Sequence, residues 1–440
     1  MLTKLKKIIL LLGDFAFSSL ALAITLLLRY PRAEFTSHWL GHWPHFLVIS
    51  LIWLMLFYIN GLYDLNLRIG RKFFRCASSA SLLTALISVL YFYLNSRTDI
   101  TPKTNLAIFI ACFFILFIVW RYLFQVIIGA FIPKERLAII GFNAHSEELI
   151  KEIGQKTGSG YEFTAIFKDS GELTELADRI KRENIRTLVV VDDFGQSANL
   201  RQLLFDCLAY KITIYNYPDF YETLTGKIPL DAIEANWFLE NLQSGRKNYF
   251  ITVKRIADII GAILILIISL PVWPLIALAI KLGSRGPVFF RQDRVGQNGR
   301  IFSIIKFRTM REEDNDRSMT VEGDKRITRI GAFLRSTRLD EIPQVINILK
   351  GEMSFIGPRP ERPETVSDLE RKIPFYKTRL LIKPGVTGWD QISGHYHSPT
   401  LEDSREKLQY DLFYLKQRSL YLDLSIALKT LATMMSRGGR

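Results

Sequence analysis

Two adjacent acidic residues, Asp340 and Glu341, lie in an arginine-rich stretch near the end of the 440-residue chain. Apolar residues at helical spacing follow the pair, and Pro343 is tolerated only in the first turn of a helix. The pattern therefore places both carboxylates at a helix N-terminus, where the helix dipole favours anions. Aspartate is also a preferred N-cap residue, so the pair by itself is more typical of a helix cap than of a catalytic site.

Cationic residues on both sides of the pair change that interpretation. Arg335 and Arg338 precede it, and Arg359 follows in a Gly-Pro-Arg-Pro turn at 357–360. Adjacent carboxylates among arginines suit a metal-assisted attack on a phosphoanhydride, because the cations offset the repulsion between anions. We therefore predict a site that acts on a phosphorylated ligand.

A predicted β-hairpin supplies two further cations. Residues 297–299 read Gln-Asn-Gly, a turn sequence, between extended runs at 288–290 and 301–307. Strand alternation places Lys306 and Arg308 on one face, and two cations together suit a phosphate. The predicted phosphate-binding residues are therefore Arg335, Arg338, Arg359, Lys306 and Arg308.

The elements that must position these groups begin with four apolar runs, each long enough to cross a bilayer as a helix. They predict transmembrane helices at residues 8–28, 46–62, 76–94 and 106–130. Basic residues before the first run, in the second loop and after the fourth place both ends of the bundle in the cytoplasm. Asp14 and Arg121 lie within the runs and could form a pair, for which helix packing is a simpler explanation than substrate handling.

A different pattern begins near residue 136, where β-rich runs alternate with polar helical stretches. This alternation predicts a small parallel sheet with crossover helices. The runs lie at 137–140, 163–167, 188–191 and 212–215. Gly141 ends the first strand, but Phe142 and Asn143 follow where a dinucleotide site needs more glycines. A structural, regulatory or dimer-forming domain is therefore favoured over a dinucleotide-binding one.

A fifth apolar run, residues 256–280, has basic residues on both flanks and Pro271 and Pro274 in its middle. Two basic flanks disfavour a crossing, and the prolines break the helix. A re-entrant hairpin that enters and leaves on the cytoplasmic face fits both features. The alternative, a kinked fifth span, would export the rest of the chain.

Composition agrees with a membrane enzyme of phosphorylated substrates. The net charge is +14 and the mean hydropathy is +0.14. A basic excess suits an anionic partner, and lipid and phosphates fit better than nucleic acid beside so much apolar sequence. The three cysteines have no metal-ligand spacing and cannot all pair, so neither a zinc site nor a disulfide framework is predicted.

From residue 254 onward the motifs together resemble the bacterial sugar transferases, the polyprenyl-phosphate glycosyl-1-phosphate transferases of the monotopic superfamily. The four predicted spans and the Rossmann-like domain are similar to the long members of that family. The shared motifs are Lys254-Arg255-x-x-Asp258, Pro271, 306–310, 339–344, 357–360 and 383–389.

The resemblance implies transfer of a sugar phosphate from a UDP-sugar to undecaprenyl phosphate, with Mg²⁺ and release of UMP. Asp340 would form the covalent intermediate, and Glu341 would be the second member of the pair. Both are candidate metal ligands, and the choice between metal ligand and base stays open for Glu341. Arg335 and Arg359 would contact phosphate, and Pro271 would shape the membrane bend. The enzyme would work at the cytoplasmic face of a bacterial inner membrane, alone or as a homodimer, in exopolysaccharide, capsule or O-antigen assembly.

Two features depart from the resemblance. Leu270 precedes Pro271 where small members can carry serine, so a hydroxyl-to-backbone contact at the bend is expected to be unavailable. The residues after Trp389 also differ, and His395 and His397 among them are more typical of hydrogen-bonding residues than of metal ligands. The sequence therefore does not name the sugar.

Two rival functions remain. Asp314 and Asp316 could hold Mg²⁺ in a membrane-anchored glycosyltransferase, although the charged stretch around them is more typical of a solvated loop. A catalytically silent membrane scaffold is the other, and the intact acidic pair argues against it.

The predicted fold class is a membrane α/β protein with three parts. Residues 1–132 form a four-helix transmembrane bundle, and 133–246 form the small Rossmann-like parallel α/β domain. Residues 247–440 form a mainly helical catalytic domain, with the re-entrant membrane hairpin at 256–280.

Overall fold

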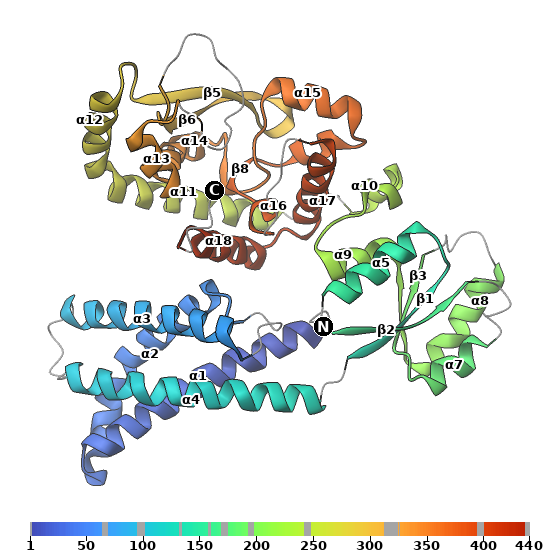
Figure 1. Ribbon diagram of the computed structural model, residues 1–440, viewed down its shortest axis with the longest axis horizontal. Helices are drawn as coiled ribbons and strands as arrows, with labels where there is room; N and C mark the ends of the chain where they lie inside the picture. The colour runs from blue at the N-terminus through green and yellow to red at the C-terminus, as the bar shows by residue number, and fades with distance from the viewer. Residues whose placement is uncertain are drawn as a thin grey trace. The chain divides into compact units, whose positions relative to one another are not determined.

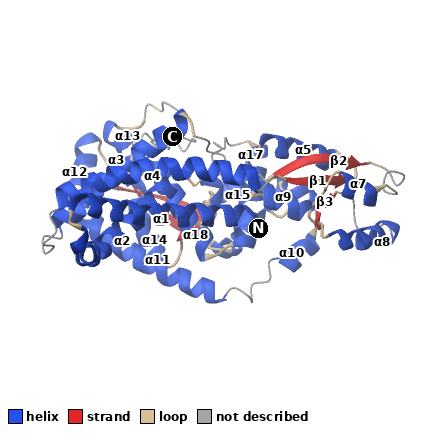
Figure 2. Cartoon of the chain, turned by 90° about the horizontal axis from the view of Figure 1, so that it is seen from below, coloured by secondary structure: helices blue, strands red, loops and turns tan. Residues whose placement is uncertain are grey.

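The computed structural model describes residues 2–63, 69–94, 102–131, 134–156, 160–168, 175–191, 198–241, 248–311, 324, 326–393 and 400–435. The chain divides into two compact units, Met1–Phe220 and Tyr221–Arg440. The first unit holds a helical bundle and a parallel sheet, and the second holds the acidic pair (Figures 1 and 2).

Four long helices form the bundle: α1 (Leu2–Arg29), α2 (Phe35–Ile59), α3 (Arg71–Leu94) and α4 (Pro102–Phe131), with the short 3-10 helix η1 (Arg32–Glu34) after α1. Aromatic rings of α2 and α4 interlock in its core, with centroids 4.6 Å apart for Trp53 and Phe113 and 4.8 Å apart for Phe57 and Phe117. By length and composition α1, α2 and α4 can cross a membrane, whereas the apolar part of α3 is the shorter Cys76–Phe92. The fourth long apolar stretch among the described residues is Tyr249–Gly283.

Asp14 and Arg121 form the predicted pair inside the bundle. The Arg121 guanidinium donates to Asp14 Oδ2 at 2.6 Å and to the carbonyl of Leu62 at 2.7 Å. Both side chains are almost wholly buried. Charges in an apolar environment require such partners, so the pair joins α1 to α4.

The sheet of the first unit has four parallel strands in the order β2-β1-β3-β4, which confirms the predicted parallel arrangement. The strands are β1 (Glu135–Ile140), β2 (Tyr161–Phe167), β3 (Thr187–Val190) and β4 (Thr213–Asn216). The helices are α5 (Ala144–Gln155), α7 (Leu176–Arg182), α8 (Ala198–Cys207), η2 (Leu208–Tyr210) and α9 (Tyr217–Thr225). Helix α5 covers one face of the sheet, and α7 and α8 cover the other (Figures 1 and 2).

The loop after β1 is closed by its own side chains. Asn143 is the N-cap of α5, and its side chain accepts hydrogen bonds from the amides of His145 and Ser146. These amides lie where a dinucleotide-binding domain presents free donors to a pyrophosphate. These two amides are already hydrogen-bonded to Asn143, which agrees with the absence of the glycine-rich motif of a dinucleotide site. The role of the domain stays a prediction.

The second unit takes in the end of α9 and then a helical connection, η3 (Leu230–Ala232) and α10 (Ala235–Asn241), and continues into the long apolar stretch. That stretch is broken into α11 (Asn248–Ser269), the 3-10 turn η5 (Leu270–Val272) and α12 (Trp273–Gly283). Pro271 lies in η5, where the chain changes direction between the two helices (Figure 1). Apolar side chains on both helices remain more than half exposed, among them Ile260, Ile267, Ile268, Leu275 and Leu278.

The expectation that no hydroxyl-to-backbone contact is available at the bend is wrong. Ser269, one residue before the expected position, donates its hydroxyl to the carbonyl of Leu266 at 3.4 Å. The same hydroxyl accepts a hydrogen bond from Trp273 Nε1 at 3.1 Å across the break. A serine can serve the bend from this position because the last helical turn brings residues 266, 269 and 273 onto one side.

The body of the second unit is built on a hairpin and a short parallel pair of strands. Strands β5 (Phe289–Val295) and β6 (Ile301–Phe307) are antiparallel around η6 (Gln297–Gly299), which confirms the predicted hairpin. Strands β7 (Ser354–Ile356) and β8 (Gly385–Thr387) are parallel. The helices that surround them are α13 (Arg329–Ser336), η7 (Leu339–Gln344), α14 (Val345–Lys350), α15 (Pro363–Lys372), η8 (Tyr376–Leu381), α16 (Trp389–Ile392), α17 (Leu401–Gln417) and α18 (Leu420–Met435).

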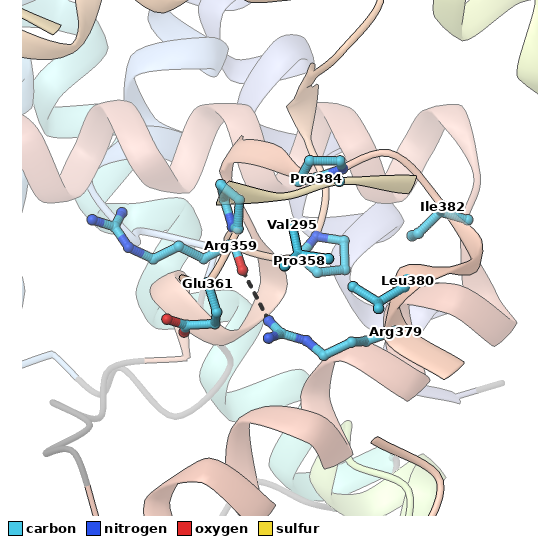
Figure 3. Close-up of a pocket in the computed structure, with 10 residues that line it drawn as sticks. Val295, Pro358, Arg359, Glu361, Arg379, Leu380, Ile382 and Pro384 are labelled. Carbon is cyan, nitrogen blue, oxygen red and sulfur yellow. Dashed lines mark hydrogen bonds between the residues drawn. The ribbon is translucent and has the colours of Figure 1, made fainter. Parts of the chain in front are cut away.

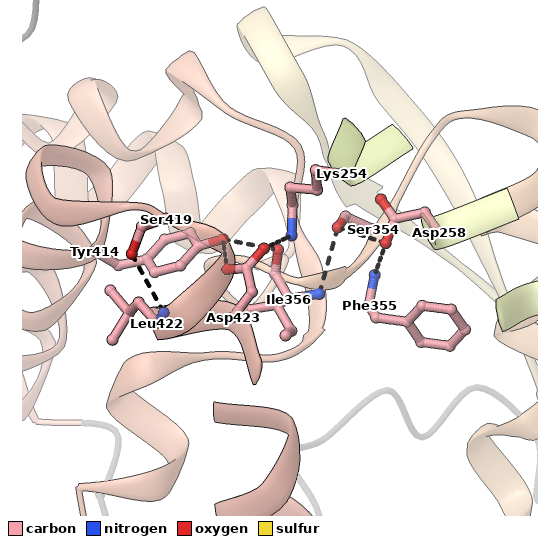
Figure 4. A network of polar contacts seen from close by, with 9 residues as sticks. All are labelled: Lys254, Asp258, Ser354, Phe355, Ile356, Tyr414, Ser419, Leu422 and Asp423. Carbon is pink, nitrogen blue, oxygen red and sulfur yellow. Dashed lines mark hydrogen bonds and ion pairs between the residues drawn. The ribbon is translucent and has the colours of Figure 1, made fainter. Parts of the chain in front are cut away.

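The Lys-Arg-x-x-Asp motif at the start of α11 joins the apolar stretch to this body (Figure 4). Lys254 pairs with Asp423 of α18 at 2.6 Å. Asp258 accepts from the Ser354 hydroxyl and from the Phe355 amide, both at 3.1 Å. The motif therefore fixes α11 to α18 and to β7.

The connection before α11 packs against the same body. Trp389 donates to the carbonyl of Gly226 at 2.9 Å, and Ile228, Leu230 and Ile233 are buried in the core that also holds Leu408, Leu412 and Ile426. The predicted boundary at residue 247 is not tested by this packing, but a fragment cut there lacks a buried part of the core.

We predict that fragment 221–440 is more stable than fragment 248–440. Each buried aliphatic side chain contributes about 1.5–3 kcal/mol, so loss of Ile228, Leu230 and Ile233 should lower the Tm by about 10 °C or more. Thermal unfolding of both fragments in the same detergent measures the difference. Equal Tm values would show that the connection does not stabilise the unit.

Candidate active site

The acidic pair lies at the start of a continuous helical segment, η7 followed by α14. Arg338 occupies the N-cap position with φ 59°, in the left-handed region, and Gly351 ends α14 with φ 84° as predicted. The helix-cap interpretation of Asp340 is wrong, because Arg338 holds the cap position and no side chain caps η7. The segment begins as a 3-10 helix, and Pro343, which has no amide to donate, lies inside that helix and not in its first turn as predicted.

Glu341 is held by cations from two other elements. Its Oε1 lies 2.6 Å from Lys306 Nζ of β6 and 3.9 Å from Arg359 Nη2. Burial by itself would raise the pKa of Glu341, but the charges of Lys306 and Arg359 outweigh burial and lower this pKa to about 2. Glu341 is therefore ionised at neutral pH.

Asp340 has a different environment although it is the next residue. It is buried, and its Oδ1 has no hydrogen-bond partner among the described residues. Burial and then the Glu341 anion raise the pKa of Asp340, while Lys306, Arg335 and Arg338 oppose the rise. A buried carboxylate oxygen without a partner is costly, which indicates a ligand, metal or reacting atom at this position.

The predicted phosphate-binding cations do not all lie beside the acidic pair. Arg335 donates from Nε to the Thr309 hydroxyl at 2.9 Å, and the charge of Arg338 acts on both carboxylates. Arg308 does not join them: its guanidinium donates to the carbonyls of Ser284 and Arg285, just after α12. Its predicted role in phosphate binding stays a prediction.

Lys306 and Arg359 face a common pocket beside the acidic pair. The pocket is lined by Arg294, Ile304, Lys306, Glu341, Gln344, Arg359, Pro360, Gly385 and Val386. Lys306 and Arg359 thus lie beside Glu341 in this pocket, and apolar side chains of β6 and β8 form part of its wall. The sequence analysis assigned no role to Arg294 or Gln344, although Gln344 lies within the 339–344 motif and Arg294 lies in the predicted hairpin.

Two glycine motifs meet at the base of this pocket. The amide of Gly357 donates to the carbonyl of Thr387, and the amide of Gly385 donates to the carbonyl of Pro358, both at 2.9 Å. A Cβ on Gly385 would lie within the atoms of Gly357, so no larger residue fits. The Gly-Pro-Arg-Pro turn therefore packs backbone against backbone on the segment that begins with Lys383-Pro384-Gly385.

The residues that could hold a divalent cation are few. The described residues contain no group of three or more His, Cys, Asp or Glu side chains suited to a metal. Mg²⁺ commonly needs only one or two carboxylates, with water and substrate phosphates as its other ligands. Asp340 fits this pattern through its unpartnered Oδ1, whereas Glu341 Oε1 is already paired with Lys306. Asp314, Asp316, His395 and His397 lie outside the described residues.

We predict that Lys306→Met destabilises the protein in a pH-dependent manner. The lowered pKa of Glu341 contributes stability above its unfolded value near 4.5, and this contribution is lost as the pH falls towards 2. Removal of one partner of a buried pair should cost about 2–4 kcal/mol at pH 7. The Tm difference from the unsubstituted protein should shrink at pH 3.5.

Lys350→Met is the matched control, because Lys350 is exposed at the end of α14. It should change the Tm little at either pH. An equal Tm loss for Lys306→Met at pH 7 and pH 3.5 would contradict the assigned charge pair.

Comparison with known proteins identifies relatives of the chain. Residues 249–437 match the family model of the bacterial sugar transferases. The chain is 38% identical over 255 residues to an Aeromonas hydrophila protein named UDP-N-acetylgalactosamine-undecaprenyl-phosphate N-acetylgalactosaminephosphotransferase, a match that covers 57% of this chain and 59% of the relative.

Two further relatives match over more of their length. Both are named UDP-glucose:undecaprenyl-phosphate glucose-1-phosphate transferase. The Escherichia coli protein is 31% identical over 68% of this chain and 67% of its own length. The Klebsiella pneumoniae protein is 30% identical over 79% of this chain and 78% of its own length. The chain belongs to the bacterial sugar transferase family.

Proposed function

We propose that this protein transfers a sugar-1-phosphate from a UDP-sugar to undecaprenyl phosphate, with release of UMP. The observation that carries the proposal is the buried Asp340, whose Oδ1 lacks a partner, among the cations Lys306, Arg335 and Arg338. The names of the relatives describe the same reaction class. In this proposal the product is the first lipid-linked intermediate of exopolysaccharide, capsule or O-antigen assembly.

The proposed reaction has two displacements at one phosphorus atom. An Asp340 oxygen attacks the sugar-bearing phosphorus of the UDP-sugar, and the bond from that phosphorus to the bridging oxygen breaks. UMP leaves with the bridging oxygen, and the sugar phosphate remains on Asp340. A phosphate oxygen of undecaprenyl phosphate then attacks the same phosphorus, which gives the lipid-pyrophosphate sugar and regenerates the carboxylate.

The division of charge in the pair supports different roles for its two members. Glu341 is ionised and paired with Lys306, so its position is fixed, whereas Asp340 keeps an oxygen open for reaction. Arg335, Arg338 and Arg359 would offset the repulsion between Asp340 and the diphosphate. Mg²⁺ bound by Asp340 and the donor phosphates would supply further neutralising charge.

A role of Glu341 as a base for the acceptor is the alternative that the sequence left open. Its low pKa makes it a weak proton acceptor, and the acceptor phosphate is largely ionised near neutral pH, so a strong base is not needed. We therefore favour an electrostatic role, in which the Glu341 anion holds Lys306 and Arg359 at the donor phosphates.

The apolar stretch supports a membrane acceptor. Helices α11 and α12 leave large apolar side chains exposed on both sides of the Pro271 break, and this surface suits lipid rather than water. We propose that the stretch is a re-entrant hairpin in the inner membrane and that the catalytic body lies on the cytoplasmic face.

We predict that Asp340→Asn abolishes transfer, because it keeps the shape and removes the nucleophile. Glu341→Gln should reduce transfer and leave partial labelling of the protein. The assay is UMP release from UDP-glucose and UDP-N-acetylgalactosamine, the two sugars in the relatives' names, with undecaprenyl phosphate.

Mass spectrometry of protein exposed briefly to the donor without lipid should find the sugar-phosphate adduct on Asp340. Full activity in Asp340→Asn would disprove the covalent mechanism. Glycoside formation without UMP release would instead favour a glycosyltransferase, and no reaction with any UDP-sugar would favour a scaffold.

We also predict the topology of the hairpin. In a variant without Cys76, Cys112 and Cys207, single cysteines in place of Tyr249 and Arg285, two exposed residues at the ends of the stretch, should resist a membrane-impermeant label added outside cells. Both should react after the cells are opened. Outside labelling at residue 285 alone would show a fifth span.

A further inference from the structure

Three consecutive carbonyl groups at the end of the Gly-Pro-Arg-Pro turn each accept a hydrogen bond. The carbonyl of Arg359 accepts from Arg379 Nη2 at 3.0 Å, and that of Pro360 accepts from Arg294 Nη1 at 3.1 Å. The carbonyl of Glu361 accepts from the amide of Val295 at 3.0 Å. Each carbonyl group of the backbone from Arg359 to Glu361 is therefore held by a hydrogen bond.

The Arg359 side chain extends away from these contacts. In Figure 3 the Arg379 guanidinium is directed at the Arg359 carbonyl, and the Arg359 guanidinium lies on the opposite side of the turn. The Arg359 side chain is 40% exposed, and its Nη2 lies 3.9 Å from Glu341 Oε1. The position of the backbone beneath this side chain sets where the guanidinium can reach relative to Glu341.

Arg379 is too deeply buried to reach a substrate. Only 3% of it is exposed, and its three nitrogens are each engaged within the chain. Nε donates to Asp411 Oδ2 and Nη1 donates to the Tyr376 hydroxyl, both at 2.8 Å, while Nη2 makes the bond to Arg359. The buried carboxylate of Asp411 compensates its charge.

Arg294 holds the same turn from the hairpin. It lies in β5, and its Nη2 also donates to the side chain of Gln292 at 2.7 Å. It is 20% exposed and lines the pocket that contains Lys306, Glu341 and Arg359. The two arginines therefore support adjacent carbonyls from two different elements.

We propose that Arg379 and Arg294 are positioning residues, which act on the reaction by fixing the backbone that aims Arg359 at the donor diphosphate. The proposal rests on the proposed function. It adds Arg379 and Arg294 as residues that affect the reaction only through the position of Arg359. A cation held in place before the substrate binds needs no reorganisation during the reaction.

The test is a double-mutant cycle in the full-length protein. Arg379→Lys keeps a charge beside Asp411, but one ammonium cannot reproduce the fixed geometry of three donors. It should lower kcat/KM for UMP release by about 10- to 100-fold. Arg359→Ala should lower kcat/KM by about 100-fold. In the Arg359→Ala background, Arg379→Lys should then change kcat/KM by less than about twofold, because its target is gone.

Arg405→Lys is the matched control, since Arg405 pairs with the exposed Asp231 and takes no part in these contacts. It should leave kcat/KM unchanged in both backgrounds. Tm values of all variants separate stability from positioning, because a Tm loss caused by Arg379→Lys should persist in the Arg359→Ala background while the kinetic loss disappears.

An equal loss of kcat/KM from Arg379→Lys in both backgrounds would overturn the proposal. If Arg379→Lys does not fold, the same cycle with Arg294→Lys decides, because Arg294 is less buried and holds the neighbouring carbonyl. Binding of inorganic pyrophosphate with Mg²⁺, measured by calorimetry, repeats the cycle without turnover. The protein could show non-additive effects of the two substitutions on pyrophosphate binding and yet release no UMP from any UDP-sugar. That result would reject the proposed function and retain the proposal that Arg379 positions Arg359.

Discussion

The ion pair between Lys306 and Glu341 is the interaction on which the site depends. Two adjacent carboxylates are buried at the start of η7, and two unpaired anions in that environment would repel each other and lose their hydration. Lys306 compensates one of them from β6 at 2.6 Å. The pairing allows Glu341 to stay ionised and leaves Asp340 with a carboxylate oxygen that has no partner among the described residues.

The helical segment that carries the pair is anchored at its other end by the apolar stretch. Arg255 of α11 donates to the carbonyls of Ile348 and Leu349, at 2.6 and 2.9 Å, in the last turn of α14. A cation is favourable at a helix C-terminus, where carbonyl groups lack helical partners. The apolar helix and the acidic pair therefore belong to one connected body, which suits the proposed reaction, in which a soluble donor and a lipid acceptor react at the same carboxylate.

Local patterns predicted much of this architecture. The hairpin at residues 289–307, the parallel strands of the first unit and the helix end at Gly351 follow from alternation, turn residues and glycine, which act over a few residues. Errors arose where position mattered more than residue type. Arg338 rather than Asp340 took the N-cap position, and Ser269 served the bend from one residue away.

The sequence by itself determined the acidic pair, the cations that flank it and the apolar stretch that precedes it, because each is a local run of residue types with a fixed chemistry. Only the tertiary structure decided which cation meets which carboxylate. Lys306 and Arg308 are two residues apart, yet one pairs with Glu341 and the other binds the carbonyls after α12. Likewise Arg379 supports Arg359 from 20 residues away. Such partners are set by how the chain packs on itself, since a charge in the interior must find its counterpart in space and not in sequence.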